Sequence, residues 1–392
     1  METLTLGALS DIDGLLSPEE RLVRDNVRRF VRERYLPRAA ELYQNERFPL
    51  DLVQEIADLG LLGAGISDYG CAGMNSVQYG LLLQELEYGD SGLRSFVSVQ
   101  GSLTMYAIHA FGSEEQRRKY LPEMAKGKKI GCFGLTEPDS GSDPASMKTR
   151  ARRDGNEFVL NGSKTWITNS PICDLAVVWA KVEDGGPESI TGFLVERGAR
   201  GFETPRVHGK MSLRSSETGE IVLEDCRVPA SNVLAGKRGL AAPLRCLDQA
   251  RFGIAWGAVG AAKACFDATL NYAKNRVQFQ APIAQKQLVQ VAFADAATEI
   301  IAAELMVYHF ARLKDRRGEL RPPQVSLCKR NNVAKALDVA RRCRAILGAN
   351  GILLEYPVIR HMLNLESVYT YEGTHEIHTL VLGKALTGYD AF

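Results

Sequence analysis

The chain has 392 residues, of which 45% are hydrophobic and 24% are charged. These proportions are typical of a folded globular protein and exclude disordered, collagen-like and disulfide-scaffold chains. The 48 Lys and Arg residues are balanced by 47 Asp and Glu residues, so the chain lacks the basic excess of a nucleic-acid-binding protein. No apolar stretch reaches the roughly 18 residues that a membrane helix needs. We therefore expect a soluble enzyme.

Two features of the sequence bear on the compartment. The eight cysteines form no C-x-x-C pair, which excludes the usual zinc fingers and thioredoxin-type dithiols. Most of them lie in apolar surroundings, so we expect buried, reduced thiols. Residues 1–16 are acidic and contain no arginine, unlike a signal peptide or a mitochondrial presequence. We expect a cytoplasmic protein, or one of the mitochondrial matrix if a presequence has been removed.

The first part of the chain is predicted to be helical. Ser17-Pro18 followed by two glutamates is a helix start, and apolar residues then recur at helical spacing. The helices that this pattern predicts cover about 18–43, 49–60, 76–88, 92–111 and 114–126.

The pattern changes near Gly127. Short β-rich runs separated by Asp-Gly, Gly-Gly and Asn-Gly steps continue to about residue 235 and predict an antiparallel β domain. Helical patterns then return at about 239–273, 284–315, 322–347 and 375–387. The predicted fold class is α+β, with an N-terminal helical domain (1–128), a middle β domain (129–236) and a C-terminal helical bundle (237–392).

A search for common motifs finds neither G-x-G-x-x-G nor G-x-x-x-x-G-K-[ST], the usual phosphate-binding loops. The segment His375-Glu376-Ile377-His378 has its histidines three residues apart. A zinc-binding H-E-x-x-H motif needs them four apart on one helical face. We expect no metal site.

Arg94 lies at an unusual position. Asp90-Ser91-Gly92 predicts a helix break with an N-cap, so Arg94 falls in the first turn of the next helix, where a cation opposes the helix dipole. Residues 95–113 contain no charged side chain, which predicts a buried helix. A buried arginine needs an anionic partner. That partner is either Glu87 or Asp90 in a structural ion pair, or the carboxylate of a ligand, held with help from Ser95.

Glu372 lies just before the last predicted helix and is followed by Gly373, which lets the backbone approach a ligand closely. Two interpretations remain open for it: an exposed acid that caps the helix, or a positioned general base.

Several long blocks of the sequence resemble the acyl-CoA dehydrogenase family, and most closely its glutaryl-CoA dehydrogenases. The resemblance covers nearly the whole chain. The blocks that carry it are DSGLRSFVSVQ (90–100), GCFGLTEPDSGSDPASM (131–147), NGSKTWITNSP (161–171), ARFGIAWG (250–257), KRNN (329–332), GANGI (348–352) and YEGTHEIH (371–378).

The resemblance implies an N-terminal helical domain, a middle β domain and a C-terminal four-helix bundle, assembled as a homotetramer. It also implies FAD as cofactor, an acyl-CoA substrate and electron-transfer flavoprotein as the electron acceptor. The cofactor-binding residues that it implies within one subunit are Phe133, Leu135, Thr136, Gly141, Ser142, Trp166, Ile167 and Thr168. Those implied at the FAD of a neighbouring subunit or at its adenosine end are Arg276, Gln278, Phe279, Gln287, Leu347, Gly348, Thr374 and Glu376.

For the chemistry, the resemblance implies Glu372 as the catalytic base that removes the α-proton of the thioester. The substrate-binding residues that it implies are Arg94, Ser95, Ser98, Ser142, Asp248, Arg251, Glu87, Tyr371 and Gly373. Arg94 would hold the far carboxylate of glutaryl-CoA, and Glu87 and Tyr371 would share Arg94 so that CO2 can leave. The expected reaction is oxidation and decarboxylation of glutaryl-CoA to crotonyl-CoA and CO2.

Other functions stay open at this point. They are a dehydrogenase of another dicarboxylic or carrier-bound acyl thioester, an enzyme that stops at glutaconyl-CoA, an oxidase, and a non-catalytic relative. The sequence also departs from the family in two places: Gln280 follows Arg276-Val-Gln-Phe where the family usually has glycine, and Gly348-Ala349 replaces a Gly-Gly pair.

Overall fold

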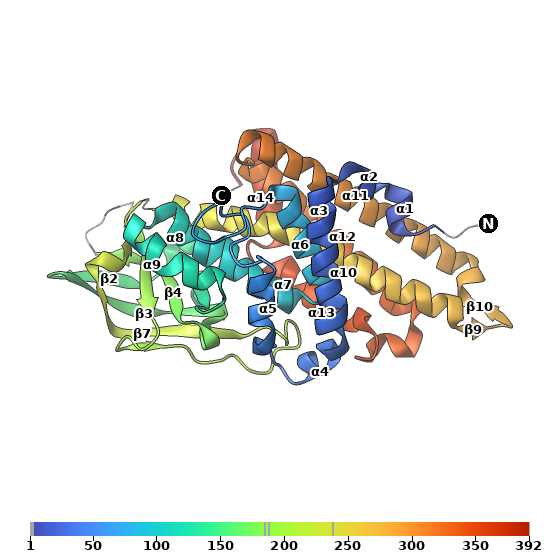
Figure 1. Ribbon diagram of the computed structural model, residues 1–392, viewed down its shortest axis with the longest axis horizontal. Coiled ribbons are helices and arrows are strands. Elements are labelled where there is room, and N and C mark those ends of the chain that lie inside the picture. The colour runs from blue at the N-terminus through green and yellow to red at the C-terminus, as the bar shows by residue number, and fades with distance from the viewer. Residues whose placement is uncertain (1–3, 184–185, 187–188, 237–238, 392) are drawn as a thin grey trace.

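The computed structural model describes residues 4–183, 186, 189–236 and 239–391 (Figure 1). Helices from both ends of the chain pack together, and the middle of the chain forms a β domain at one end of the molecule. The predicted order of helices, β domain and helices is therefore confirmed. The predicted boundary at residue 237 lies outside the described residues, and the two domain boundaries stay predictions.

The N-terminal part is helical, as predicted, but more finely divided. Its helices are α1 (Leu6–Ser10), α2 (Ile12–Leu15), α3 (Pro18–Phe30), α4 (Ala39–Gln44), α5 (Val53–Asp58), α6 (Ser76–Gly89), α7 (Ser91–Ser98), α8 (Tyr106–Phe111) and α9 (Glu114–Ala125). The predicted helix over 18–43 is interrupted by a π-helical turn (Val31–Tyr35) and a 3-10 turn (Leu36–Arg38). Pro37 explains the second interruption, because proline lacks the N–H that a continuous helix needs.

Side-chain caps fix where the helices begin. Ser17 begins α3 with a capping box closed by Glu20. Asp90 is the N-cap of α7, where its carboxylate accepts a hydrogen bond from the N–H of Gly92 at 2.6 Å. Arg94 therefore lies at the start of a helix whose residues are all buried, as the uncharged stretch predicted. The helix continues as a π-helical segment (Val99–Met105) into α8.

The middle of the chain forms one sheet. Its strands are β1 (Gly131–Gly134), β2 (Arg150–Asp154), β3 (Glu157–Thr168), β4 (Leu175–Val182), β5 (Ile190–Glu196), β6 (Phe202–Glu203), β7 (Thr218–Pro229) and β8 (Val233–Leu234). The strand order is β6-β7-β3-β2-β4-β5-β8, with β1 on β4.

The prediction of an antiparallel domain was wrong for two pairs, because β1 and β2 both run parallel to β4. Alternation of apolar and polar residues identifies a strand without giving its direction, and long connections permit either one.

The C-terminal part contains α10 (Ala241–Asn275), α11 (Gln287–Arg317), α12 (Pro322–Ile346), α13 (Pro357–Thr370) and α14 (His375–Thr387). A hairpin of β9 (Val277–Gln278) and β10 (Ala281–Pro282) joins α10 to α11. Helix α13 was not predicted, although its start at Tyr356-Pro357 places proline at the favoured first helical position.

Two apolar cores hold the helices together. One joins the N-terminal helices to β1 and β4, and includes Leu93, Phe96 and Phe133. The other lies within the C-terminal bundle, around α10 and α12. All eight cysteines are free thiols, and seven of them are buried. No helix in the described part of the chain is long and apolar enough to cross a membrane.

Candidate active site

Arg94 lies at the centre of a buried polar cluster where both ends of the chain meet. Its Nε donates to Oε2 of Glu87 on α6 at 2.7 Å, and its Nη2 donates to the hydroxyl of Tyr371, which follows α13. The other Glu87 oxygen accepts from Ser91 at 2.7 Å. Burial opposes the charge, but Glu87 and Tyr371 hold the pKa of Arg94 above its ordinary value. Arg94 is therefore a fixed cation with one anionic partner.

Helix α10 covers this ion pair closely. A Cβ at position 257 would lie 1.9 Å from Oε2 of Glu87 and 3.3 Å from Nε of Arg94. Only glycine leaves room for the carboxylate there, so Gly257 lets a helix backbone form one wall of the cluster.

Asp90 has a different role from the ion pair that the sequence left open. Its carboxylate binds Arg360 of α13 at 2.5 Å and also accepts from Asn364 at 3.0 Å. Ser215, in the segment before β7, donates to it at 2.6 Å. Arg360 overcomes the effect of burial and keeps the pKa of Asp90 below its ordinary value. Asp90 thus ties the start of α7 to α13, and the anion beside Arg94 is Glu87.

Glu372 lies between α13 and α14 in a strained conformation. Its φ of 50° is in the left-handed region, which non-glycine residues rarely adopt. The side chain is half-buried, and its Oε2 has no hydrogen-bond partner among the described residues. Burial raises the pKa of Glu372, while Arg94 and Arg251 act in the opposite direction. The interpretation as a helix cap was wrong, because Thr374 caps α14.

The backbone around Glu372 is held by side chains from two helices. The carbonyl of Glu372 accepts from Nε of Arg251 at 2.8 Å and lies 3.3 Å from Nε2 of His378. Arg251 in turn is oriented by Asp248 at 3.1 Å. The structure therefore brings Glu372, Arg251 and Asp248 together with the Arg94 cluster, and Gly373 completes the turn at a φ of 86°.

Two hydroxyls on α7 lack partners. The Oγ atoms of Ser95 and Ser98 are buried and have no hydrogen-bond partner among the described residues. Buried polar groups are normally satisfied, so unpartnered ones beside Arg94 indicate a place for the polar end of a ligand. Nearby, Tyr79 bonds Ser102, and burial raises its pKa to about 12. Sequence reasoning missed Tyr79, for which no local motif gives a signal.

The residues predicted to contact the cofactor from the β domain lie along β1, the loop after it and β3. Phe133 and Leu135 are buried, whereas Gly141 and Ser142 are exposed. The carbonyl of Thr136 accepts from the N–H of Thr165 at 2.9 Å, so the loop is anchored to β3. A buried ion pair that the sequence analysis missed adds to this anchor, with Nζ of Lys164 2.8 Å from Glu137.

Trp166 stands out on β3. Between Lys164 and Ile167 the pairing with β7 shifts register, and Trp166 has a φ of 59°. This irregularity turns the indole outward, where it is 63% exposed, while Ile167 stays buried and Thr168 is half-buried. A large aromatic face exposed on a strained turn fits a flat cofactor ring lying across it.

The other predicted cofactor residues do not all reach this region. Thr374 and Glu376 lie two and four residues after Glu372. Arg276, Gln278 and Phe279, in contrast, lie at the opposite end of α10 from Arg251, in and before the β9–β10 hairpin (Figure 1). Since a helix rises about 1.5 Å per residue, Arg251 and Arg276 are roughly 38 Å apart. The remaining members of this distant group are Gln287, Leu347 and Gly348.

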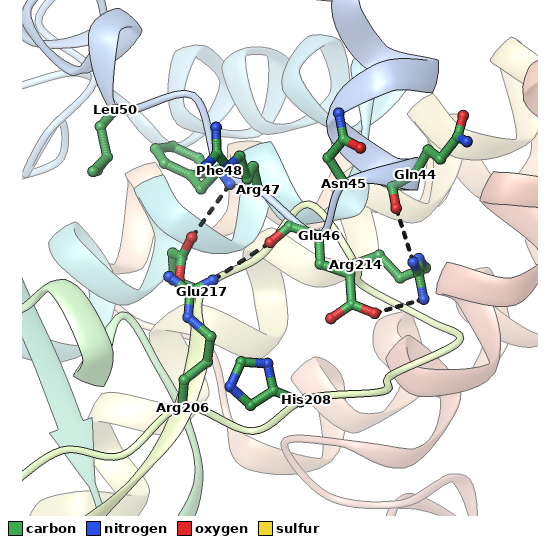
Figure 2. A pocket seen from close by; sticks show the side chains of 10 residues that line it. All are labelled: Gln44, Asn45, Glu46, Arg47, Phe48, Leu50, Arg206, His208, Arg214 and Glu217. Carbon is green, nitrogen blue, oxygen red and sulfur yellow. Dashed lines mark hydrogen bonds and ion pairs between the residues drawn. The ribbon is translucent and has the colours of Figure 1, made fainter.

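A cavity of about 630 Å³ lies elsewhere, between the segment after α4 and the segment before β7 (Figure 2). Four of its charged side chains form two ion pairs: Arg214 lies 2.7 Å from Glu46, and Arg206 contacts Glu217. No predicted site residue lines it. This cavity therefore adds nothing to the Glu372 site.

Three family profiles match the chain: the acyl-CoA dehydrogenase N-terminal domain over residues 17–128, the middle domain over 132–226 and the C-terminal domain over 237–387. A crystal structure of a glutaryl-CoA dehydrogenase from Mycobacterium smegmatis in complex with FADH2 is 50% identical, with a TM-score of 0.97 and 100% of both chains covered. A second glutaryl-CoA dehydrogenase structure from this organism is 53% identical, with the same TM-score and coverage.

The chain is also similar in sequence to acyl-CoA dehydrogenases. An acyl-CoA dehydrogenase of Bacillus subtilis (strain 168) is 35% identical over 377 residues, which are 95% of this chain and 99% of the relative. The three domains match in order, and relatives cover nearly the full chain. This chain belongs to the acyl-CoA dehydrogenase family.

Proposed function

We propose that this chain is an FAD-dependent glutaryl-CoA dehydrogenase that oxidises and decarboxylates its substrate to crotonyl-CoA and CO2, and passes the electrons to electron-transfer flavoprotein. The observation that carries the proposal is a buried arginine beside the candidate base. No described residue accepts a hydrogen bond from Nη1 of Arg94, and the hydroxyls of Ser95 and Ser98 have no partner. The far carboxylate of a glutaryl chain supplies the acceptor that these three groups lack.

Glu372 is proposed as the base. Its unpartnered Oε2 takes the α-proton of the thioester, and its raised pKa makes it a stronger base than an exposed carboxylate. Its own N–H donates to no described residue and is free to bind the thioester oxygen, where negative charge develops. When bound, FAD accepts the β-hydrogen as hydride.

Decarboxylation follows from the same arrangement. The oxidised product, glutaconyl-CoA, loses its far carboxylate as CO2, and the electrons delocalise into the thioester. Glu372, now protonated, returns a proton to the carbon chain to give crotonyl-CoA. Too strong a grip by Arg94 would stabilise the carboxylate and slow this step. Glu87 and Tyr371 share the guanidinium and so weaken that grip.

The residues present fit FAD, because Trp166 offers an exposed aromatic face and the carbonyl of Thr136 is bound to the adjacent Thr165. We propose that the distant group at the hairpin binds the FAD of a second copy of the chain in a homotetramer, because it lies too far from Glu372 to reach the same cofactor. The large exposed side chains there, Phe279 and Leu288, also fit burial between copies. The free cysteines are consistent with a reducing compartment such as the cytoplasm.

The deciding experiment is anaerobic mixing of the purified holoenzyme with glutaryl-CoA, followed by mass spectrometry of the products. Flavin bleaching with formation of crotonyl-CoA is the expected result. Bleaching with only glutaconyl-CoA would remove decarboxylation and leave the dehydrogenase. No bleaching would rule out glutaryl-CoA as the substrate.

Arg94→Gln tests the assignment of the carboxylate site. We expect the specificity constant for glutaryl-CoA to fall at least tenfold more than that for butyryl-CoA, which has no far carboxylate. Equal losses for the two substrates would show that Arg94 is structural.

A further inference from the structure

Lys329 on α12 is buried next to the segment that carries Glu372. Its Nζ donates to the carbonyls of Gly373 at 2.8 Å, Tyr371 at 3.0 Å and Tyr369 at 3.4 Å. An ammonium group has three N–H donors, so these three carbonyls use all of them. Fully buried lysines are rare unless paired. Here the partners are backbone atoms on both sides of one residue, Glu372.

The segment needs such an anchor for two reasons. The last carbonyls of α13 have no partners within the helix. Glu372 also adopts a left-handed conformation that is unfavourable for a residue with a side chain, and the surroundings must offset this strain. Arg251 and His378 bind the carbonyl of Glu372 itself. Lys329 donates the hydrogen bonds to the carbonyls of the residues on either side of it.

We propose that Lys329 is a positioning residue, which holds residues 369–373 in the conformation that directs the Glu372 carboxylate at the substrate. The inference rests on the proposed function of Glu372 as the base. Lys329 begins the KRNN block (329–332), but the sequence gives it no role, because its three acceptors lie some 40 or more residues further along the chain.

Lys329 also acts on Glu372 through its charge. The charged groups that face Glu372 are Arg94 from α7, Arg251 from α10 and Lys329 from α12. Glu376 of α14 also faces Lys329. Burial, together with the nearby Arg251 and Arg94, lowers the pKa of Lys329 to about 7, whereas the negative charge of Glu372 favours the charged form of the lysine. Removing this cation lets the pKa of Glu372 rise further.

The test compares Lys329→Met with a matched control, Lys335→Met, on the same helix. Lys335 is partly exposed and pairs with Glu299 at 2.8 Å, away from the site. Each holoenzyme is mixed anaerobically with saturating acyl-CoA, and the rate of flavin reduction is followed across pH. The acyl-CoA is glutaryl-CoA, or butyryl-CoA if the unmodified enzyme does not reduce its flavin with glutaryl-CoA. This choice distinguishes the case in which glutaryl-CoA is not the substrate from the case in which Lys329 does not position Glu372.

We expect Lys329→Met to keep its FAD and its substrate affinity within about threefold. Its flavin-reduction rate is expected to fall roughly 100-fold, the size of loss that a misplacement of about 1 Å causes. The midpoint of the pH profile moves up by about one unit, because Glu372 must lose its proton without a neighbouring cation. Lys335→Met is expected to match the unmodified enzyme in both respects. An unchanged rate and midpoint in Lys329→Met would overturn the proposal.

Lys329→Arg and Lys329→Gln keep the test decisive if the methionine variant does not fold. Arginine retains the charge and the donors, so we expect at least a tenth of the rate with the original pH midpoint. Glutamine retains one amide donor group without the charge, and is expected to show the upward shift. If both neutral variants are unfolded, Lys329 maintains the fold as a whole, and a specific positioning role is refuted.

Discussion

At the scale of single residues, the site depends on polar groups that the protein itself leaves without partners. Oε2 of Glu372 and the hydroxyls of Ser95 and Ser98 are buried without acceptors or donors, although an unmade buried hydrogen bond costs about 1–3 kcal/mol. Buried polar groups without partners are expected where a bound ligand supplies the missing hydrogen bond. These three atoms without hydrogen-bond partners therefore identify the candidate site as clearly as its charged groups do.

Glu372→Gln isolates the proton transfer. Glutamine has nearly the same shape and cannot accept a proton at neutral pH, so the variant is expected to bind FAD and acyl-CoA normally. Flavin reduction is expected to slow by about 10²- to 10⁴-fold, the usual contribution of a general base. The measurement is anaerobic stopped-flow absorbance of the flavin. Bleaching at the original rate would remove Glu372 as the base.

The pH dependence of the unmodified enzyme follows from the same residue. Burial raises the pKa of Glu372 above its ordinary value of 4.5. Since only the deprotonated carboxylate is a base, the rate of flavin reduction is expected to rise with pH through a midpoint above 4.5. A midpoint at or below that value, measured at saturating substrate, would show that the neighbouring cations outweigh burial.

At the scale of elements, the β9–β10 hairpin has residues in its turn that do not suit the backbone conformation they adopt. The hairpin between β9 and β10 turns through Phe279 and Gln280, whose φ values of 52° and 63° are both positive. Two-residue turns of this kind favour glycine or asparagine, because other side chains are strained there. Gln280 is neither glycine nor asparagine, so this chain carries strain at that position.

Gln280→Gly is therefore expected to raise the free energy of unfolding by about 1 kcal/mol. Gln285→Gly is the matched control, since Gln285 lies in the 3-10 turn Ile283–Gln285 just after the hairpin. The control is expected to be neutral or destabilising, because glycine adds backbone freedom without relieving strain. Urea unfolding of both variants compares them directly. A loss of stability in Gln280→Gly would mean that the side chain makes contacts that outweigh the strain.

Most of the helices and strands could be predicted from the sequence, but the contacts between distant segments could not. Caps at Ser17 and Asp90 are local signals, and the helices that they begin were found. The contact of Arg94 with Glu87 joins residues only seven apart, so it was among the alternatives. The parallel pairing of β1 and β2 with β4, and the contact of Lys329 with the Glu372 segment, depend on distant parts of the chain. No periodicity encodes such contacts. For Glu372, the local sequence left a helix cap and a general base both open, and the family resemblance favoured the base.

At the scale of the whole molecule, the length of α10 separates two groups of proposed cofactor-binding residues, one near Glu372 and one at the β9–β10 hairpin. Its 35 residues place Arg251 near Glu372 and leave the hairpin at the far end. Phe279 is 90% exposed there, and its ring contacts little besides Lys286, whose Nζ lies 5.8 Å from the ring centre. A large aromatic side chain that is this exposed fits contact with another copy of the chain.

Phe279→Ala is expected to leave the fold intact and to weaken both assembly and FAD retention. Leu22→Ala is the control, because Leu22 is also exposed but lies on α3. Sedimentation velocity reports the assembly, and flavin absorbance after gel filtration reports the bound FAD. Unchanged assembly and FAD content in Phe279→Ala would remove the hairpin from the proposed interface.

The pairing within the Arg94 cluster also bears on how the protein is made. Tyr371 lies 277 residues beyond Arg94, and synthesis at about 5–20 residues per second delays it by roughly 14–55 s. Glu87, in contrast, leaves the ribosome before Arg94, only seven residues ahead of it. The growing N-terminal part can therefore neutralise its buried cation while the rest of the chain is still being translated. The anionic partner of Arg94 is therefore synthesised first, and its hydroxyl partner Tyr371 is synthesised near the end of the chain.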